Sequence, residues 1–342
     1  MPPRPDLSPL LGLLLTFCGC LGQSEPGAAA AAARAKILIG RGEFDAAVAT
    51  LNAAVADSPD DPELYADRAL AKERLGDDRG AEEDYSRAID LDPRHFRSLN
   101  DRAAIRARGG RFEGAIADLT AAIDVRPTTA LPYANRAQAL IDSGDAESAL
   151  SDLAAVERID PRDPMTPLRR GDALLMLGRD EDALLAYDAA VRMDPGSVAA
   201  HRQRARALVR LSRYAAAAEA MAAAAATEPS VGESEEAADV EAMRRLDAAL
   251  SEIGARLRVR GDEWAAVADG EERPLVVAAD FDGRAVVDAE EVRTLRQRGG
   301  LLALPVGEGY AVSDAASFDL TNLVPASYYV DRPAETPPPV AD

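Results

Sequence analysis

The residues best suited to covalent or metal chemistry are scarce in this sequence. Its two cysteines, Cys18 and Cys20, lie in an apolar N-terminal stretch, and its only histidines are His95 and His201. A structural zinc site needs about four cysteine or histidine ligands, which two histidines cannot supply. The body of the chain also lacks a thiol that could act as a nucleophile or form a disulfide. We therefore expect no metal, no cofactor and no disulfide framework.

Two short motifs in the C-terminal third resemble parts of ligand-binding loops. Asp280 and Asp282 are close together, but the spaced acidic ligands and closing glutamate of a calcium loop are missing. Gly307-Glu308-Gly309 is not followed by the lysine and helix of a phosphate loop. Both motifs are more typical of turns. Because the chain after Glu263 also contains no histidine, cysteine or lysine, we predict that the protein is not an enzyme.

The composition favours a helical, acidic protein. The 342 residues carry a formal net charge of −20, and the only lysines are Lys36 and Lys72. Binding to nucleic acid needs a broad basic face, so nucleic acid is not an expected partner. Aromatic residues make up only 4%, and the alanines occur in long clusters, which suits closely packed helices. An acidic surface of this kind favours solubility and basic partners.

Residues 1–22 have the layout of an export signal. Arg4 precedes the apolar run Leu10–Phe17, and small residues follow it. A helix needs about 20 apolar residues to cross the hydrocarbon core of a membrane, and this run is shorter. We therefore expect a cleaved signal rather than a permanent transmembrane anchor.

The end of this segment, Leu15–Cys20, resembles the lipoprotein box of bacterial envelope proteins. In that motif a cysteine after a small residue is lipidated and becomes the mature N-terminus. Gly19 supplies the small residue before Cys20, whereas Phe17 is too bulky a neighbour for Cys18. The resemblance implies a lipid on Cys20 and a membrane-anchored periplasmic or cell-surface protein. The alternative is ordinary secretion, which would give a soluble secreted or periplasmic protein.

A period of 34 residues dominates the middle of the chain. Prolines recur at this interval at Pro59, Pro93, Pro127, Pro161, Pro195 and Pro229. With each proline at repeat position 32, the six copies span residues 28–61, 62–95, 96–129, 130–163, 164–197 and 198–231. Position 7 is arginine and position 20 is alanine in every copy, and position 15 is glycine except for Ser212 in the sixth.

These positions predict two antiparallel helices in each repeat. Glycine at position 15 accepts the left-handed backbone that ends the first helix, alanine at position 20 allows close packing, and proline ends the second helix. In repeats two to four, position 23 is Asp84, Asp118 or Asp152. These aspartates predict ion pairs with the arginine at position 7. The alternative is that the charges are solvated and contribute no more than about 1 kcal/mol each.

Glycine at 15, alanine at 20, an aromatic residue or leucine at 24, alanine at 27 and proline at 32 resemble the tetratricopeptide repeat. The resemblance covers residues 28–231; Pro167 and His201 at position 4 depart from it. It implies an all-α superhelical solenoid of six helix pairs, with first helices lining a concave groove for partner peptides or helices. The resemblance therefore implies a protein-interaction scaffold, which the N-terminal segment would place in the cell envelope.

In this family the groove-facing positions are chiefly 2, 5, 6, 9, 12 and 13. In repeats two to four they predict a polar partner-binding groove that includes Arg74, Arg97, Asn100, Asp101, Arg108 and Asn135. In repeat five the same face is apolar, so Leu168, Leu175 and Met176 form either an alternative site or part of the core. Repeat six is basic, with Arg202, Arg206 and Arg210 on one helix face. Solvent, a partner or the acidic stretch 233–236 could occupy it.

After Pro229 the repeat pattern stops. We predict an amphipathic helix over residues 236–258, with Met243, Leu246, Leu250 and Ile253 on one face, that caps the stack. A small α+β module over residues 263–330 follows. Turn signals predict one hairpin from strands 275–281 and 284–287 and another from strands 301–306 and 310–313, with a helix over 289–298 between them.

The proline-rich, acidic tail, residues 331–342, is expected to be disordered. A second functional hypothesis makes the module a carbohydrate- or peptide-binding domain that uses its aromatic rings, Trp264, Tyr310, Tyr328 and Tyr329. Exposed, clustered rings would favour that function, whereas buried rings would belong to the core. Catalysis in the module is a weaker alternative, because no suitable acid–base pair is recognisable.

Overall fold

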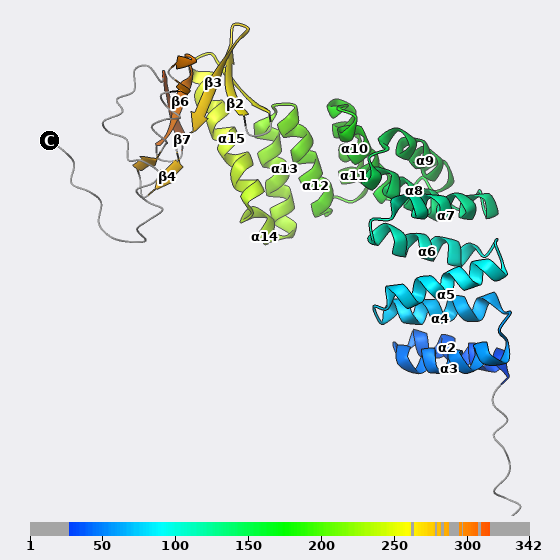
Figure 1. Ribbon diagram of the computed structural model, residues 1–342. Helices are drawn as coiled ribbons and strands as arrows, with labels where there is room; N and C mark the ends of the chain where they lie inside the picture. The colour runs from blue at the N-terminus through cyan, green and yellow to red at the C-terminus, as the bar shows by residue number, and fades with distance from the viewer. Residues whose placement is uncertain are drawn as a thin grey trace, which may run out of the picture. The chain divides into compact units, whose positions relative to one another are not determined.

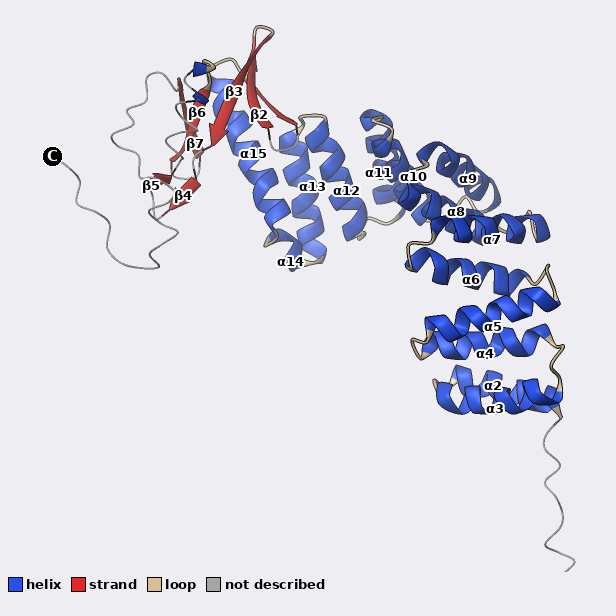
Figure 2. Cartoon of the chain, viewed as in Figure 1, coloured by secondary structure: helices blue, strands red, loops and turns tan. Residues whose placement is uncertain are grey.

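The computed structural model describes residues 27–260, 263–277, 279–281, 284–286, 294–295, 297–306 and 309–314. The predicted signal, Cys20, the tail and the rings of Tyr328 and Tyr329 lie outside these residues. The chain divides into two compact units, and the boundary between them in the sequence falls between Pro161 and Arg162. Each unit is a series of antiparallel helix pairs, and the second unit adds a small sheet (Figure 2). The predicted fold class, a helical solenoid with a small α+β module, is confirmed.

The described part of the first unit consists of the helix pairs of repeats one to four (Figure 1). These helices are α2 (Ala28–Gly40), α3 (Phe44–Asp57), α4 (Pro62–Arg74), α5 (Asp78–Leu91), α6 (Phe96–Arg108), α7 (Phe112–Val125), α8 (Ala130–Ser143) and α9 (Ala146–Ile159). The turn inside each pair depends on position 15. Gly76, for example, has a φ of +82°, a conformation that costs glycine little.

The core of each pair alternates small and large side chains. Alanine at position 20 is fully buried in all four repeats of this unit, and position 24 places Leu51, Tyr85, Leu119 or Leu153 beside it. The small residue lets the two helix backbones approach, and the large residue fills the space between successive layers. Ala115 and Leu119 form such a layer with Ala103 and Ala139 of the flanking first helices.

The second unit begins with two more repeats. Its helices are α10 (Met165–Met176), α11 (Asp180–Met193), α12 (Val198–Arg210), α13 (Tyr214–Thr227), α14 (Pro229–Gly232) and α15 (Glu235–Glu252). Ser212, the exception at position 15, adopts the same left-handed conformation as the glycines, with a φ of +57°.

Both departures at position 4 are accommodated by the fold. Tyr65 and Tyr133 each donate a hydrogen bond from the hydroxyl group to the carbonyl of the proline six residues earlier, at 3.1 and 3.3 Å. His201 replaces this contact, because its Nε2 lies 3.0 Å from the carbonyl oxygen of Pro195. Pro167 lies in the first turn of α10, where the missing N–H has no partner within the helix.

Helix α15 is shorter than the predicted helix over 236–258. Gly254 has a φ of +75° and ends it, Ile253 is exposed rather than on the buried face, and residues 256–258 belong to a strand. This strand, β1 (Arg256–Arg260), was not predicted. It pairs antiparallel with β2 (Glu263–Ala268), so the sheet begins before the predicted start at residue 263.

The main sheet has the order β1-β2-β3-β6-β7, with β3 (Glu271–Val277), β6 (Leu301–Val306) and β7 (Gly309–Asp314). Only β3 and β6 are parallel. The predicted hairpin of β6 and β7 is confirmed. The other predicted hairpin is partly wrong, because residues 275–277 belong to β3, and only β4 (Ala279–Phe281) and β5 (Arg284–Val286) form it. Of the predicted helix 289–298, the described helical residues are Thr294, Leu295 and Gln297.

Helix α15 and repeat six share one core with the sheet. Tyr214, Leu246 and Leu250 pack with Leu257 and Leu275. Two side chains also satisfy the open edge of β1: Asp247 accepts a hydrogen bond from the Leu257 amide at 2.9 Å, and the Tyr214 hydroxyl donates to the Leu257 carbonyl at 3.3 Å. Helix α15 therefore joins the sheet to the repeats. Within the described residues, no helix is long and apolar enough to cross a membrane.

Candidate functional site

Polar side chains on three successive first helices of the first unit contact one another. We define the first-helix face as repeat positions 2, 5, 6, 9, 12 and 13 of α2, α4, α6 and α8. On this face Arg97 of α6 donates to Asp67 of α4 at 2.7 Å, and its Nε lies 3.7 Å from Asp101. Asn135 of α8 donates to Asn100 of α6 at 3.1 Å. The face is therefore braced from one repeat to the next.

The second arginine of α6 on this face is also paired within the protein. Arg108 lies 2.9 Å from Glu73 and 3.2 Å from Asp78. The hydroxyl of Tyr85 lies between two acids of the face, 3.3 Å from Glu73 and 3.4 Å from Asp101. The predicted groove arginines Arg97 and Arg108 are thus already compensated.

The remaining predicted residues of this face differ in how far they are exposed. Arg74 is exposed, and it makes no ion pair with any residue that the structure describes. Asp101 and Asn135 are half-buried, whereas Asn100 is buried. The structure therefore places all six predicted residues on the first helices of repeats two to four, but it connects only five of them through polar contacts.

The electrostatics of the face disfavour further negative charge. Burial raises the pKa of Asp101, and the neighbouring carboxylate of Glu73 raises it further, against the hydrogen bond from Asn100 and the charge of Arg97. Burial likewise raises the pKa of the Tyr85 hydroxyl, together with the charges of Asp101 and Glu73. Burial and neighbouring negative charge both disfavour the ionised form of an acid, so a further anion at this point would be unfavourable.

The predicted ion pairs between positions 7 and 23 are present. Arg68 with Asp84 and Arg102 with Asp118 lie at 2.6 Å, and Arg136 with Asp152 at 2.7 Å. All three aspartates are buried, and each accepts hydrogen bonds from Nε and Nη2 of its arginine. These are therefore buried bidentate pairs, and the reading as solvated charges is wrong.

Two inter-repeat contacts of the arginines were missed. The position-7 arginines of repeats two to four also donate backwards to position 25 of the preceding repeat, which is Asn52, Ser86 or Thr120, at 2.9 to 3.0 Å. Arg204 of repeat six pairs with Asp188, at the same position, at 2.6 Å. The position-13 arginines Arg108 and Arg210 reach back to Asp78 and Asp180 at position 17 of the preceding repeat. The signal was visible in the sequence as polar partners 16 and 30 residues before each arginine.

The basic face of repeat six is occupied from within the unit. Glu236 of α15 pairs with Arg202 at 2.6 Å and with Arg206 at 2.7 Å. A pocket of about 520 Å³ lies beside these pairs, with Val209, Val240 and Met243 among its apolar lining residues. Solvent, a partner and the acidic stretch 233–236 were the possible occupants of this face. The structure shows the acidic stretch there, through Glu236.

The alternative apolar site in repeat five is only partly accessible. Leu168 is buried, Leu175 is half-buried, and Met176 is about half exposed. Leu168 therefore belongs to the core, and only Leu175 and Met176 could offer surface to a ligand.

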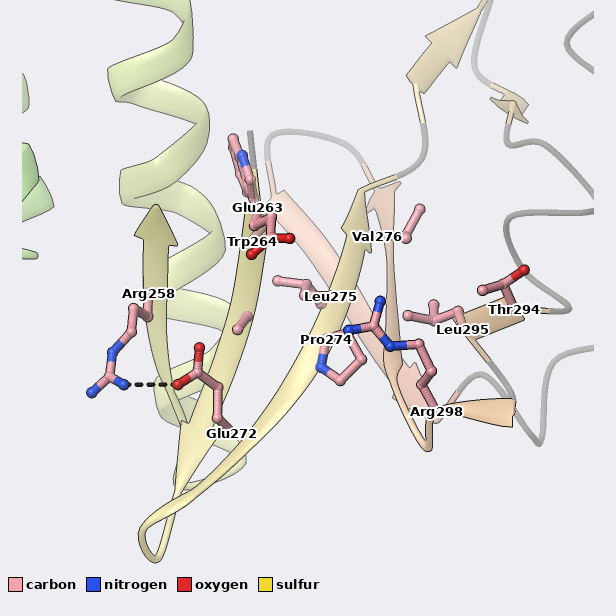
Figure 3. A pocket seen from close by; sticks show the side chains of 11 residues that line it. Arg258, Glu263, Trp264, Glu272, Pro274, Leu275, Val276, Thr294, Leu295 and Arg298 are labelled. Carbon is pink, nitrogen blue, oxygen red and sulfur yellow. Dashed lines mark hydrogen bonds and ion pairs between the residues drawn. The ribbon is translucent and has the colours of Figure 1, made fainter. Parts of the chain in front are cut away.

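The sheet carries a cavity of about 590 Å³ (Figure 3). Trp264, Pro274 and Leu295 are among its lining residues, and Arg258 pairs with Glu272 at its edge at 2.9 Å. Trp264 and Tyr310 are partly buried against the shared core, so the exposed cluster of rings expected of a carbohydrate site is not seen among the described residues. No described group of three histidine, cysteine or acidic residues could hold a metal ion.

Comparison with known proteins identifies the repeats. The family model described as the tetratricopeptide repeat matches residues 32–95, 66–135, 134–198 and 168–233. The chain belongs to the tetratricopeptide repeat family. No curated protein sequence matches it.

Two solved structures of tetratricopeptide proteins share the fold. PilF of Pseudomonas aeruginosa is 19% identical, with a TM-score of 0.53 over 63% of this chain and 96% of that chain. PilW, a type IV pilus biogenesis factor, is 18% identical, with a TM-score of 0.55 over 62% of this chain and 97% of that chain. Tetratricopeptide arrays bind other proteins or peptides, and this chain is a protein-interaction scaffold of that kind.

Proposed function

We propose that the first-helix face of repeats two to four is the main partner-binding surface and that it receives a peptide or helix. The residues concerned are Arg74, Arg97, Asn100, Asp101, Arg108 and Asn135. The observation that carries the proposal is the chain of polar contacts from α4 through α6 to α8, made by Asp67, Arg97, Asp101, Asn100 and Asn135. Such a surface is held in place before the ligand arrives, which lowers the entropic cost of binding.

The six residues divide into contact and positioning roles. Arg74 and Arg108 are the most exposed and can reach a ligand. Asn100 is buried and orients Asn135, while Arg97 holds α4 and α6 together. Recognition is therefore polar and mixed in sign, which favours specificity and steering over raw affinity.

Two variants on the face test this proposal. Arg74→Glu breaks no ion pair of the described residues, so we expect it to weaken partner capture, measured by pull-down and mass spectrometry, without changing the melting temperature. Asn135→Arg also removes the hydrogen bond to Asn100, so we expect it to weaken capture with at most a small fall in the melting temperature. Arg79→Glu on α5 is the control, because Arg79 is exposed and lies outside the first-helix face. If both face variants capture partners normally while Leu175→Asp abolishes capture without unfolding, the partner site is the apolar face of repeat five.

We further propose that the protein is exported and held at a membrane by a lipid on Cys20. Gly19-Cys20 directly after the apolar run supports this, and a scaffold at a membrane face would tether partners in the cell envelope. Labelling with a fatty-acid analogue in a lipoprotein-competent host should mark the parent and leave Cys20→Ala unmarked. Equal labelling of the two proteins, or labelling of neither, would reject the anchor and favour ordinary secretion.

A non-catalytic role for the C-terminal module completes the proposal. Its described rings support the shared core, and its edge strand is bonded to Tyr214 and Asp247 of the helical part. The module thus closes the end of the array and supports repeat six, and no described observation favours carbohydrate binding over this structural role.

A further inference from the structure

We propose that the first-helix face contains a subsite for a cation of the partner, either a lysine or arginine side chain or an N-terminal ammonium, at the carboxylate of Asp67. This inference rests on the proposed function, since it concerns the same face. It specifies that the partner group bound here is positively charged, which excludes an acidic peptide at this point.

Asp67 has a buried carboxylate oxygen that lacks a hydrogen-bond donor. Asp67 is only 2% exposed, yet its Oδ2 has no hydrogen-bond donor among the described residues, while Oδ1 accepts from Arg97. Buried carboxylate oxygens in folded proteins are nearly always hydrogen-bonded, because an unpaired one loses its hydration without compensation, and this loss is larger for a charged group than for a neutral one. A donor from a ligand would remove this cost.

Lys36 places a weakly held cation beside that oxygen. The ammonium of Lys36, on α2, lies 3.6 Å from Oδ2, beyond the range of a good hydrogen bond. Its side chain is 60% exposed, so its ammonium can turn into solvent at little cost. Lys36 therefore marks where a cation is stabilised and can be displaced by a better-placed one.

The charged residues connected to Asp67 carry a net negative charge. Four carboxylates, Asp67, Glu73, Asp78 and Asp101, share three cations, Lys36, Arg97 and Arg108. The single hydroxyl hydrogen of Tyr85 cannot serve both Glu73 and Asp101 at once. One additional positive charge brings this cluster to neutrality, whereas an anion would enlarge the imbalance.

A short random-peptide library displayed on phage provides the probe. Selection on the full chain should enrich lysine or arginine in the bound peptides. For a selected synthetic peptide, Asp67→Asn should weaken binding roughly 10- to 100-fold, the range for a hydrogen bond to a charged group. Lys36→Met should instead tighten binding by up to about fivefold, because it removes an exposed internal competitor.

Matched controls keep the two proposals separable. Glu83→Gln and Arg79→Met remove one charge of each sign from an exposed pair on α5 and should leave binding unchanged. The cation subsite is rejected and the face retained if peptides that lose binding with Asn135→Arg need no cation. Such peptides would carry no lysine or arginine, or tolerate norleucine in its place, and would also tolerate acetylation of the N-terminus. Weaker or unchanged binding to Lys36→Met also rejects the subsite. Peptides insensitive to both Asn135→Arg and Arg74→Glu, or no selected peptide at all, reject both proposals.

Discussion

At the scale of single residues, the arginine at position 7 of repeats two to four forms an ion pair with a carboxylate of its own repeat. In repeats two to four the partner aspartate is buried and takes both hydrogen bonds that a carboxylate can accept from one guanidinium edge. Breaking such a pair leaves an uncompensated buried charge, which costs more than the pair itself contributes. The arginines therefore stabilise the array only while their aspartates are present.

Asp118→Ala tests how much the array depends on these buried ion pairs. Asp118 accepts from Arg102 at 2.6 Å and from Arg106 at 2.9 Å, so its removal leaves the largely buried guanidinium of Arg102 without a carboxylate and leaves Arg106 with Glu82 alone. We expect the free energy of unfolding, measured in urea, to fall by about 3–5 kcal/mol. Glu83→Ala, which breaks the exposed pair with Arg79, should cost less than about 0.5 kcal/mol. Similar losses in the two variants would contradict the assignment.

Glu241 should give stability an acid-sensitive component. Hydrogen bonds from Arg244 and Arg245, against a desolvation cost, lower its pKa from 4.5 to about 2. Because the folded pKa is the lower one, this contribution is complete above about pH 5 and is lost as the pH falls towards 2. Glu241→Gln should therefore be slightly less stable than the parent at pH 7, by no more than about 1 kcal/mol for so exposed a group. Urea melts at pH 7 and pH 3 should show the difference shrink; a constant difference would refute it.

At the scale of helices, repeat five shows why position 8 is glycine there and alanine in the other repeats. A methyl group on Gly171 would overlap the ring of Tyr187. Repeat two has Ala69 and Tyr85 at the corresponding positions, and there the tyrosine ring is directed elsewhere. The Tyr85 hydroxyl points to Glu73 and Asp101, whereas the Tyr187 hydroxyl bonds to Asp172, the neighbour of Gly171.

Gly171→Ala should accordingly destabilise the protein, although alanine is the better helix former. Overpacking costs about 1–3 kcal/mol, and helix propensity returns about 1 kcal/mol. Gly114→Ala is the matched control, because its methyl group meets only the flexible side chain of Arg106, and it should be neutral or stabilising. Thermal melts that rank Gly171→Ala above the parent would show that the ring can move aside.

The helices were predictable from sequence because one pattern is repeated six times, and errors in a single copy are corrected by the others. The end of α15 and strand β1 were not, since Ile253, Leu257 and Val259 fit a helical face as well as a strand. Their conformation depends on Gly254 and on the contacts of Leu257 with Tyr214 and Asp247. Likewise, family positions placed Arg97 and Arg108 on one face, but their acidic partners lie some 30 to 35 residues away.

At the scale of the molecule, the second unit should unfold as one body that includes the sheet and repeat six. The only tryptophan, Trp264, packs against the core that contains Tyr214. Tyr214→Ala should lower the denaturant midpoint of Trp264 fluorescence, since removing a large buried side chain costs about 3–5 kcal/mol. Tyr85→Ala in the first unit makes the same chemical change and should leave that midpoint in place. Equal shifts would show that the two units unfold together.

The backward contacts of the position-13 arginines also determine how the array can be altered by duplication or grafting. Repeat three carries Arg108 for an acid of repeat two, and repeat six carries Arg210 for an acid of repeat five. A single copy of either repeat, inserted behind repeat one, three, four or six, would meet Phe44, Phe112, Ala146 or Tyr214 at that place instead of an aspartate. The smallest portion that can be transplanted with its contacts intact is therefore a pair of consecutive repeats.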